Sequence, residues 1–204
     1  MKSFSRRQFI KRLAGSSVLL SALGLLRSCG KGSRARVVLG GGGFGGSTCA
    51  RYLQKFDSSL KITLIEPSRQ FITCPFSNMV ISGMQTMDSI SQGYTAQKNR
   101  DINVLHTRVR AIDASVRMVA LDNGDVLQYD RLVLSPGIDF KWCDVEGMDE
   151  SDAEIIPHAL QGGSQTDLLR NTLTAMPDGG VVSLQPPKNP FLCPPGPYWP
   201  LSFI

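Results

Sequence analysis

The sequence lacks the ligand spacings of the common zinc and haem sites. Its cysteines form no C-x-x-C pair, and only two histidines accompany them in 204 residues. Structural zinc sites use clustered cysteine and histidine ligands, and c-type haem attachment needs a C-x-x-C-H motif, so neither site is predicted. The five cysteines are Cys29, Cys49, Cys74, Cys143 and Cys193.

Acidic residues are absent from the first 36 positions, which carry nine basic residues. The remaining positions carry thirteen basic and seventeen acidic residues, so the formal charge of +5 divides into +9 for the N-terminal segment and −4 for the rest. Nucleic-acid-binding proteins concentrate positive charge on a folded surface. The sequence therefore predicts no nucleic-acid partner.

The N-terminal apolar run is too short to cross a bilayer. It extends over fourteen residues, from Leu13 to Leu26, where a span needs about 20. The preceding segment, Ser5-Arg6-Arg7-Gln8-Phe9-Ile10-Lys11, is similar to the twin-arginine motif of exported proteins. We therefore expect residues 1–34 to be a signal peptide read by the twin-arginine translocase, and the mature chain to be periplasmic. The alternatives are a basic N-terminal tail or amphipathic helix, and a lipoprotein signal with Cys29 as the acylated residue.

The rest of the chain has the composition of a globular domain, with 42% hydrophobic and 19% charged residues. Short apolar runs that end at glycine or proline predict strands, apolar residues at helical spacing predict helices, and the pair Asn123-Gly124 predicts a hairpin. The expected strands are 36–39, 61–66, 118–121, 126–129, 132–134 and 180–184, and the expected helices are 45–55 and 160–173. This order predicts an α/β, Rossmann-like domain with an inserted β-hairpin.

The first expected strand ends in a glycine-rich turn that matches G-x-G-x-x-G at Gly41, Gly43 and Gly46. In such a turn the first glycine permits a tight bend, the second lets the backbone approach a pyrophosphate, and the third lets the helix pack closely on the strand. The helix N-terminus presents unpaired N–H groups to the phosphates. Glu66 follows Gly46 by twenty residues, where a carboxylate can accept hydrogen bonds from a ribose. Together these features predict a dinucleotide site.

Two further segments favour FAD over a nicotinamide cofactor. Tyr129 to Gly137 is similar to the strand and turn that follow the hairpin region in flavoprotein reductases with two dinucleotide domains. The strand expected at 180–184 is followed by Pro186 and Pro187 rather than by a glycine cradle, and proline has no N–H for a phosphate. We expect an FAD-binding domain at 35–178 and the start of a second Rossmann-like domain at 179–204.

From Arg36 to Tyr198 the chain resembles the flavoprotein subunit of flavocytochrome c sulfide dehydrogenase. The likeness rests on four segments, which are the glycine turn with Glu66, Phe71 to Asn78, Tyr129 to Gly137, and Pro190 to Tyr198. The resemblance implies an FAD enzyme that passes electrons from sulfide to a c-type cytochrome subunit. It also implies that Gly137 is among the residues that bind FAD.

Two cysteines gain a function from this resemblance. It implies that Cys74 joins the 8α-methyl carbon of the flavin covalently, the alternative being a packed cysteine. It also implies that Cys193 is one half of a redox-active disulfide beside the flavin, where hydrosulfide would form a persulfide. The remaining candidates are expected to be structural or incidental, and they are Cys49, Cys143, His106 and His158.

The last residues depart from the family pattern. The sequence from Trp199 to Ile204 differs from the helix start expected there, and the partner of Cys193 would lie beyond Ile204. We therefore expect an incomplete chain, from a fragment or a frameshifted gene. Two other functions remain open, a sulfide:quinone oxidoreductase and a catalytically silent FAD-binding remnant.

Overall fold

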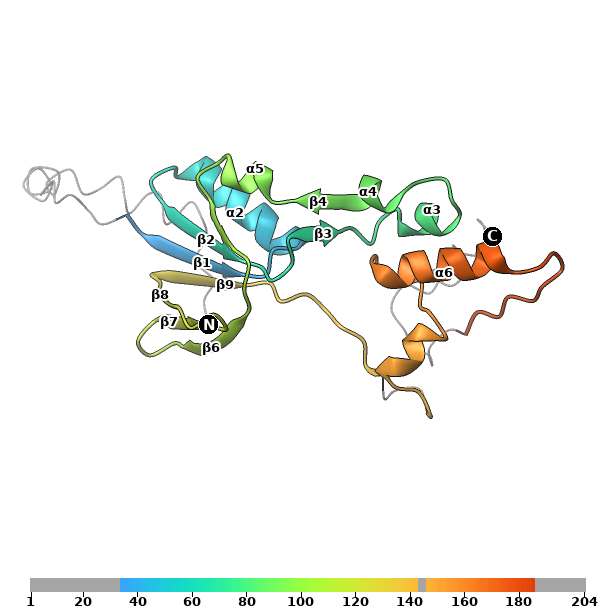
Figure 1. The fold of residues 1–204 in the computed structure, drawn as a ribbon. Helices are drawn as coiled ribbons and strands as arrows, with labels where there is room; N and C mark the ends of the chain where they lie inside the picture. Colours follow the sequence, from blue (N-terminus) through green and yellow to red (C-terminus); the bar gives the residue numbers. More distant parts are fainter. Residues whose placement is uncertain (1–33, 143–145, 186–204) are drawn as a thin grey trace, which may run out of the picture. The chain divides into compact units, whose positions relative to one another are not determined.

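The largest sheet among the described residues is parallel and four-stranded, in the order β5-β2-β1-β9 (Figure 1, where β1, β2 and β9 are labelled). The structure, a computed structural model, describes residues 34–142 and 146–185. The twin-arginine segment, Cys29, Cys143 and Cys193 lie outside these residues. The strands of the sheet are β1 (Arg36–Gly40), β2 (Lys61–Ile65), β5 (Asn103–Leu105) and β9 (Arg131–Leu134).

The two central strands are almost continuous apolar runs because both faces of the sheet are covered. Leu39 of β1 and Leu64 of β2 are fully buried and are paired in the strand register. They belong to one hydrophobic cluster, whereas Val38 and Ile65 belong to a second. Successive side chains of a strand point to opposite faces, so each cluster lies on one face of the sheet.

Helix α2 (Phe44–Phe56) packs on the first of these clusters. Its buried residues, Gly46 and Ala50, are four positions apart and therefore share one side of the helix. The helix ends at Asp57, whose N–H donates to the carbonyl oxygen of Leu53. The helix predicted at 45–55 is confirmed to within one residue at each end.

An antiparallel three-stranded sheet contributes to the second cluster through Val119 and Leu121. Its strands are β6 (Val109–Asp113), β7 (Met118–Leu121) and β8 (Val126–Gln128). The turn between β7 and β8 places Gly124 at φ +92°, a left-handed conformation that glycine adopts without strain. The predicted hairpin is confirmed, and β6 is an additional strand that the sequence did not reveal.

The remaining elements are short, except for one helix. They are β3 (Gln70–Ile72), α3 (Ser77–Ile81), α4 (Met87–Ile90), β4 (Ser91–Gly93), α5 (Thr95–Lys98), a 3-10 helix η3 (Glu150–Glu154) and α6 (Ser164–Ala175). Strands β3 and β4 form an antiparallel pair. Arg170 of α6 donates hydrogen bonds to the carbonyl oxygens of Val80 and Gln85, at 3.3 and 3.2 Å. This side chain ties α6 to α3 and to the loop after it.

Two expected elements near the C-terminal side differ in the structure. The predicted strand at 180–184 is wrong, because no strand forms there and Val181 is 90% exposed. A strand needs a neighbour for its backbone N–H and C=O groups, and none of the described strands pairs with this segment. The helix predicted at 160–173 begins later, at Ser164, because the two consecutive glycines before it, Gly162 and Gly163, disfavour helix. Among the described residues, no helix is long and apolar enough to span a membrane.

Candidate functional site

The turn between β1 and α2 is closed by backbone contacts that exclude side chains. Gly41 has φ +101°, and a Cβ atom on it would overlap the carbonyl oxygen of Ser135. A Cβ atom on Gly46 would overlap the carbonyl oxygen of Gly41. These two positions therefore require glycine for the tight bend and for the close approach of helix and strand, as the motif predicts.

Gly43 lies at the N-cap of α2, and no side chain caps this end of the helix. A Cβ atom on Gly43 would lie 3.3 Å from the ring of Phe71, which also packs edge-on against Phe44 with 4.9 Å between ring centroids. The first N–H groups of a helix have no partner within the helix, and the helix dipole is positive there. The uncapped turn therefore fits a pyrophosphate, the anionic centre of a dinucleotide.

Glu66 follows β2 and reaches back to the glycine turn. Its Oε2 atom accepts a hydrogen bond from the N–H of Gly42 at 2.7 Å, and its Oε1 atom accepts one from the N–H of Ser68 at 2.9 Å. Each carboxylate oxygen has a further lone pair, so Glu66 can still accept hydrogen bonds from ribose hydroxyls. The predicted ribose position is thus beside the glycine turn.

The turn after β9 also meets the glycine turn. The N–H of Ser135 donates to the carbonyl oxygen of Gly40 at 2.8 Å, and a Cβ atom on Gly45 would lie 3.3 Å from the hydroxyl oxygen of Ser135. Gly137, two residues further on, has φ +83° and open space around its Cβ position. The start of this turn therefore reaches the site through Ser135, whereas no described residue lies within 4 Å of the Cβ position of Gly137.

Residues 35–172 match a family model described as Pyridine nucleotide-disulphide oxidoreductase. The chain belongs to this family. A second model, described as the central part of the sulfide dehydrogenase (flavocytochrome c) flavoprotein chain, matches residues 166–204. The same flavoprotein chain from Chlorobaculum thiosulfatiphilum is 60% identical over 45 residues, which cover 22% of this chain and 94% of that sequence. These matches confirm the resemblance found from the sequence motifs.

More distant relatives share the family fold. The type II NADH:quinone oxidoreductase NdhA of Mycobacterium tuberculosis is 31% identical over 52% of this chain, and the mitochondrial sulfide:quinone oxidoreductase of Dictyostelium discoideum is 28% identical over 57%. The matched part spans about a quarter of the length of both proteins, 23% and 26%. Among solved structures, the sulfide:quinone oxidoreductase of Aquifex aeolicus gives a TM-score of 0.58 at 22% identity, over 69% of this chain and 32% of that one. A ferredoxin reductase from Rhodopseudomonas palustris gives 0.57 at 21%, over 69% and 35%. Both structures confirm the Rossmann-like fold.

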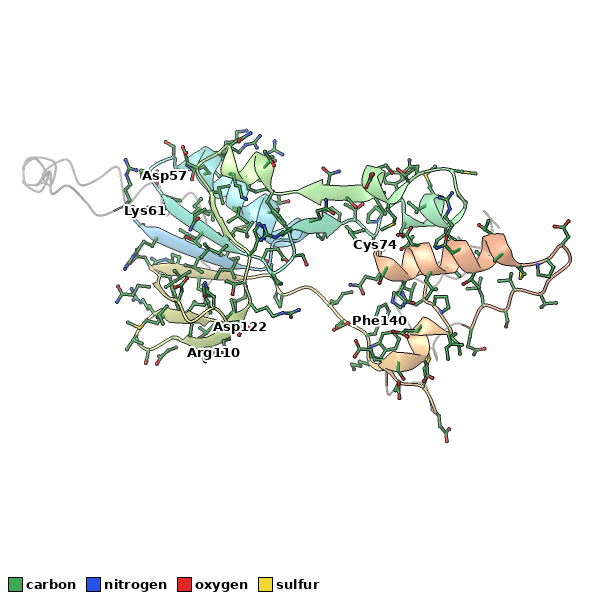
Figure 2. The ribbon with its side chains drawn as sticks, viewed as in Figure 1. Asp57, Lys61, Cys74, Arg110, Asp122 and Phe140 are labelled. Carbon is green, nitrogen blue, oxygen red and sulfur yellow. The ribbon has the colours of Figure 1, made fainter. Side chains whose placement is uncertain are left out.

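Cys74 lies two residues after β3 and is an exposed, free thiol (labelled in Figure 2). Its Sγ atom donates to the carbonyl oxygen of Leu160 at 3.1 Å. Strand β3 links this thiol to the glycine turn, because Phe71 contacts Gly43 and precedes Cys74 by three residues. Three residues of extended chain span at most about 10 Å, which is the upper limit for the separation of Phe71 and Cys74 along the backbone.

The other described residues considered as candidates, Cys49, His106 and His158, make contacts that stabilise the fold. Cys49 of α2 is half-buried against the first hydrophobic cluster. The Nδ1 atom of His106 lies 3.2 and 3.1 Å from the carbonyl oxygens of Glu66 and Ser68, so it braces the turn after β2. The ring of His158 lies 4.3 Å from that of Phe140 in a tilted arrangement, and burial lowers the pKa of His158. The described residues contain no cluster of metal-ligating side chains.

Three residues at the glycine turn escaped the sequence analysis, namely Gly42, Ser47 and Tyr94. A Cβ atom on Gly42 would lie 2.8 Å from the Cβ and Cγ atoms of Glu66, so this variable position of the motif also requires glycine. The hydroxyl groups of Ser47 and Tyr94 both donate to the carbonyl oxygen of Gly42, at 2.5 and 3.2 Å. The unbroken run from Gly40 to Gly43 was a signal for the first residue, whereas Tyr94 is distant in sequence and no local pattern marked it.

Proposed function

We propose that this chain is the FAD-binding part of a sulfide dehydrogenase flavoprotein, which passes electrons from sulfide through FAD to a c-type cytochrome. The observation that carries the proposal is the 60% identity to the flavocytochrome c flavoprotein chain. The glycine turn, the uncapped start of α2 and the position of Glu66 support FAD as the cofactor. Bound FAD would supply the two-electron chemistry.

The placement of FAD can be tested at Gly43. We expect Gly43→Val to weaken FAD binding by about tenfold or more. A branched side chain at the N-cap would keep the phosphates away from the backbone N–H groups at the start of α2, and hydrogen bonds to a charged phosphate are strong. Gly93→Val is the matched control, since Gly93 lies in β4 with nothing within 4 Å of its Cβ position. FAD binding and melting temperature would be measured for both variants. Undiminished FAD binding by a folded Gly43→Val protein would count against this placement.

Cys74 is proposed to carry the flavin covalently. Its thiol is exposed, and it follows β3 by two residues, a strand whose Phe71 lies beside Gly43 of the glycine turn. The phosphates at α2 and the flavin ring at Cys74 would then lie at the two ends of one extended ligand.

Covalent attachment predicts that Cys74→Ser abolishes flavin fluorescence on the denatured polypeptide. The thiolate is a far stronger nucleophile than the serine hydroxyl, and serine is nearly isosteric with cysteine. Cys49→Ser is the control, because Cys49 packs in the core side of α2 and faces no proposed ligand. Flavin that remains attached to the denatured Cys74→Ser protein would exclude this role.

Sulfide oxidation is proposed to use Cys193 as one of two sulfurs. Hydrosulfide would attack a disulfide sulfur, leaving a persulfide on one cysteine and a thiolate on the other. A second hydrosulfide would remove the outer sulfur as HSS−, and FAD would accept two electrons as the two thiols re-form the disulfide. No other cysteine of this sequence lies in a matching motif. The second candidate for this chain, left open by its sequence, is a catalytically silent FAD-binding remnant.

The two candidates are separated by anaerobic addition of sulfide. We expect no rapid bleaching of the flavin absorbance in the 204-residue protein, because one sulfur cannot complete the relay. A fusion to the C-terminal part of a full-length relative, which supplies the second cysteine, should restore bleaching, and Cys193→Ser in the fusion should remove it. Reduction of a c-type cytochrome rather than a quinone would then favour sulfide dehydrogenase over sulfide:quinone oxidoreductase. Stoichiometric bleaching of the 204-residue protein would contradict the two-sulfur mechanism.

Export to the periplasm through the twin-arginine translocase is proposed from the paired Arg6 and Arg7 ahead of a short apolar run. Lysine at both positions should block export of a reporter fused to residues 1–36, because the translocase recognises the arginine pair and not its charge alone. Arg27→Lys, beyond the apolar run, is the control and should leave export unchanged. Continued export of the double variant by another route would refute this assignment.

A further inference from the structure

The N–H and the carbonyl group of Gly42 both form hydrogen bonds with side chains, although the dinucleotide motif assigns no function to this position. Its N–H donates to Glu66 Oε2 at 2.7 Å, and its carbonyl oxygen accepts from Ser47 at 2.5 Å and from Tyr94 at 3.2 Å. The residue itself is buried. Three side chains from three different segments therefore converge on one glycine.

The carbonyl group of Gly42 shares a peptide plane with the N–H of Gly43. In a trans peptide these two groups point in opposite directions. A donor that fixes the direction of the Gly42 carbonyl therefore also fixes the direction of the Gly43 N–H, which points away from Ser47 and Tyr94. Gly43 is the N-cap of α2, at the position where the backbone approaches a pyrophosphate.

Tyr94 is well suited to hold this peptide. Its side chain is 4% exposed, and its ring lies 5.8 Å from that of His106, which itself braces the turn after β2. Burial and then the charge of Glu66 raise the pKa of Tyr94 to about 12. The hydroxyl group therefore stays protonated, and able to donate, throughout the pH range in which the protein would be assayed.

We propose that Tyr94 and Ser47 are positioning residues of the cofactor site, which hold the Gly42 carbonyl and so aim the Gly43 N–H at the pyrophosphate of the dinucleotide. This inference rests on the proposed FAD site and adds to it two residues outside the glycine motif. Neither residue touches the ligand. Both act through a single peptide group, and two donors to one buried oxygen can substitute for each other in part.

The test is a double-mutant cycle with ADP, which carries the pyrophosphate and adenosine of FAD without the flavin. We expect Tyr94→Phe and Ser47→Ala each to weaken ADP binding by about threefold to fivefold, the effect of one net hydrogen bond. The double variant should lose more than the product of the two, because the buried carbonyl then has no donor. Tyr129→Phe, another buried tyrosine that belongs to the second hydrophobic cluster, is the control and should bind ADP normally.

Three comparisons make the result decisive. Adenosine has no phosphate, so its affinity should be unchanged in the same variants, whereas a general loss of structure would weaken both ligands. In all three variants, amide hydrogen exchange should accelerate at residues 41–46 and not in β7. If the double variant does not fold, the exchange rates of the two single variants test the inference. The inference would be overturned if the double variant bound ADP as tightly as the original protein, or if exchange at residues 41–46 were unchanged in both single variants. No ADP binding by the unaltered protein would overturn the FAD site itself, and the inference with it.

Discussion

Backbone contact at the glycine turn is the constraint on which the site depends. The carbonyl oxygen of Ser135 occupies the space that a side chain on Gly41 would need, and the carbonyl oxygen of Gly41 occupies the space at Gly46. A methyl group at either position would push β9 or α2 away from β1. The same contacts that complete the sheet therefore place the N-terminus of α2 at its carboxyl edge, where open α/β sheets bind their ligands.

The charge of Glu66 is balanced by backbone groups. Two N–H groups donate to its carboxylate, and the ion pair found among the described residues, Arg36 with Asp130, does not involve it. Each carboxylate oxygen keeps a lone pair for a neutral hydroxyl donor. A ribose hydroxyl is such a donor, which agrees with the proposed placement of a dinucleotide pyrophosphate at the start of α2. The position of Glu66 and the shape of the turn thus fit the same end of the proposed ligand.

Local sequence patterns predicted the features that depend on neighbouring residues. The βαβ unit, the Asn-Gly hairpin and the requirement for Gly41 and Gly46 follow from apolar runs and from backbone geometry at the turn. The contact of Tyr94 with Gly42 joins residues 52 positions apart, and no periodicity encodes it. The strand expected at 180–184 failed for a related reason, since an apolar run becomes a strand only where a neighbouring strand accepts it.

The surroundings of Cys74 depend on still longer connections. Phe76, two residues later, has φ +71°, a conformation that costs a residue with a Cβ atom about 1 kcal/mol, so this loop needs support from the rest of the fold. Contacts with the segment that leads into α6 provide it, through the carbonyl oxygen of Leu160 and the packing of Gly162 on Thr73. The proposed attachment site is therefore built from two regions far apart in the sequence, since the contact of Cys74 with Leu160 joins residues 86 positions apart. The glycine turn is likewise completed by distant residues, Tyr94 and Ser135, but its glycines and Glu66 belong to one βαβ unit, whereas the contact of the thiol comes from the segment that precedes α6.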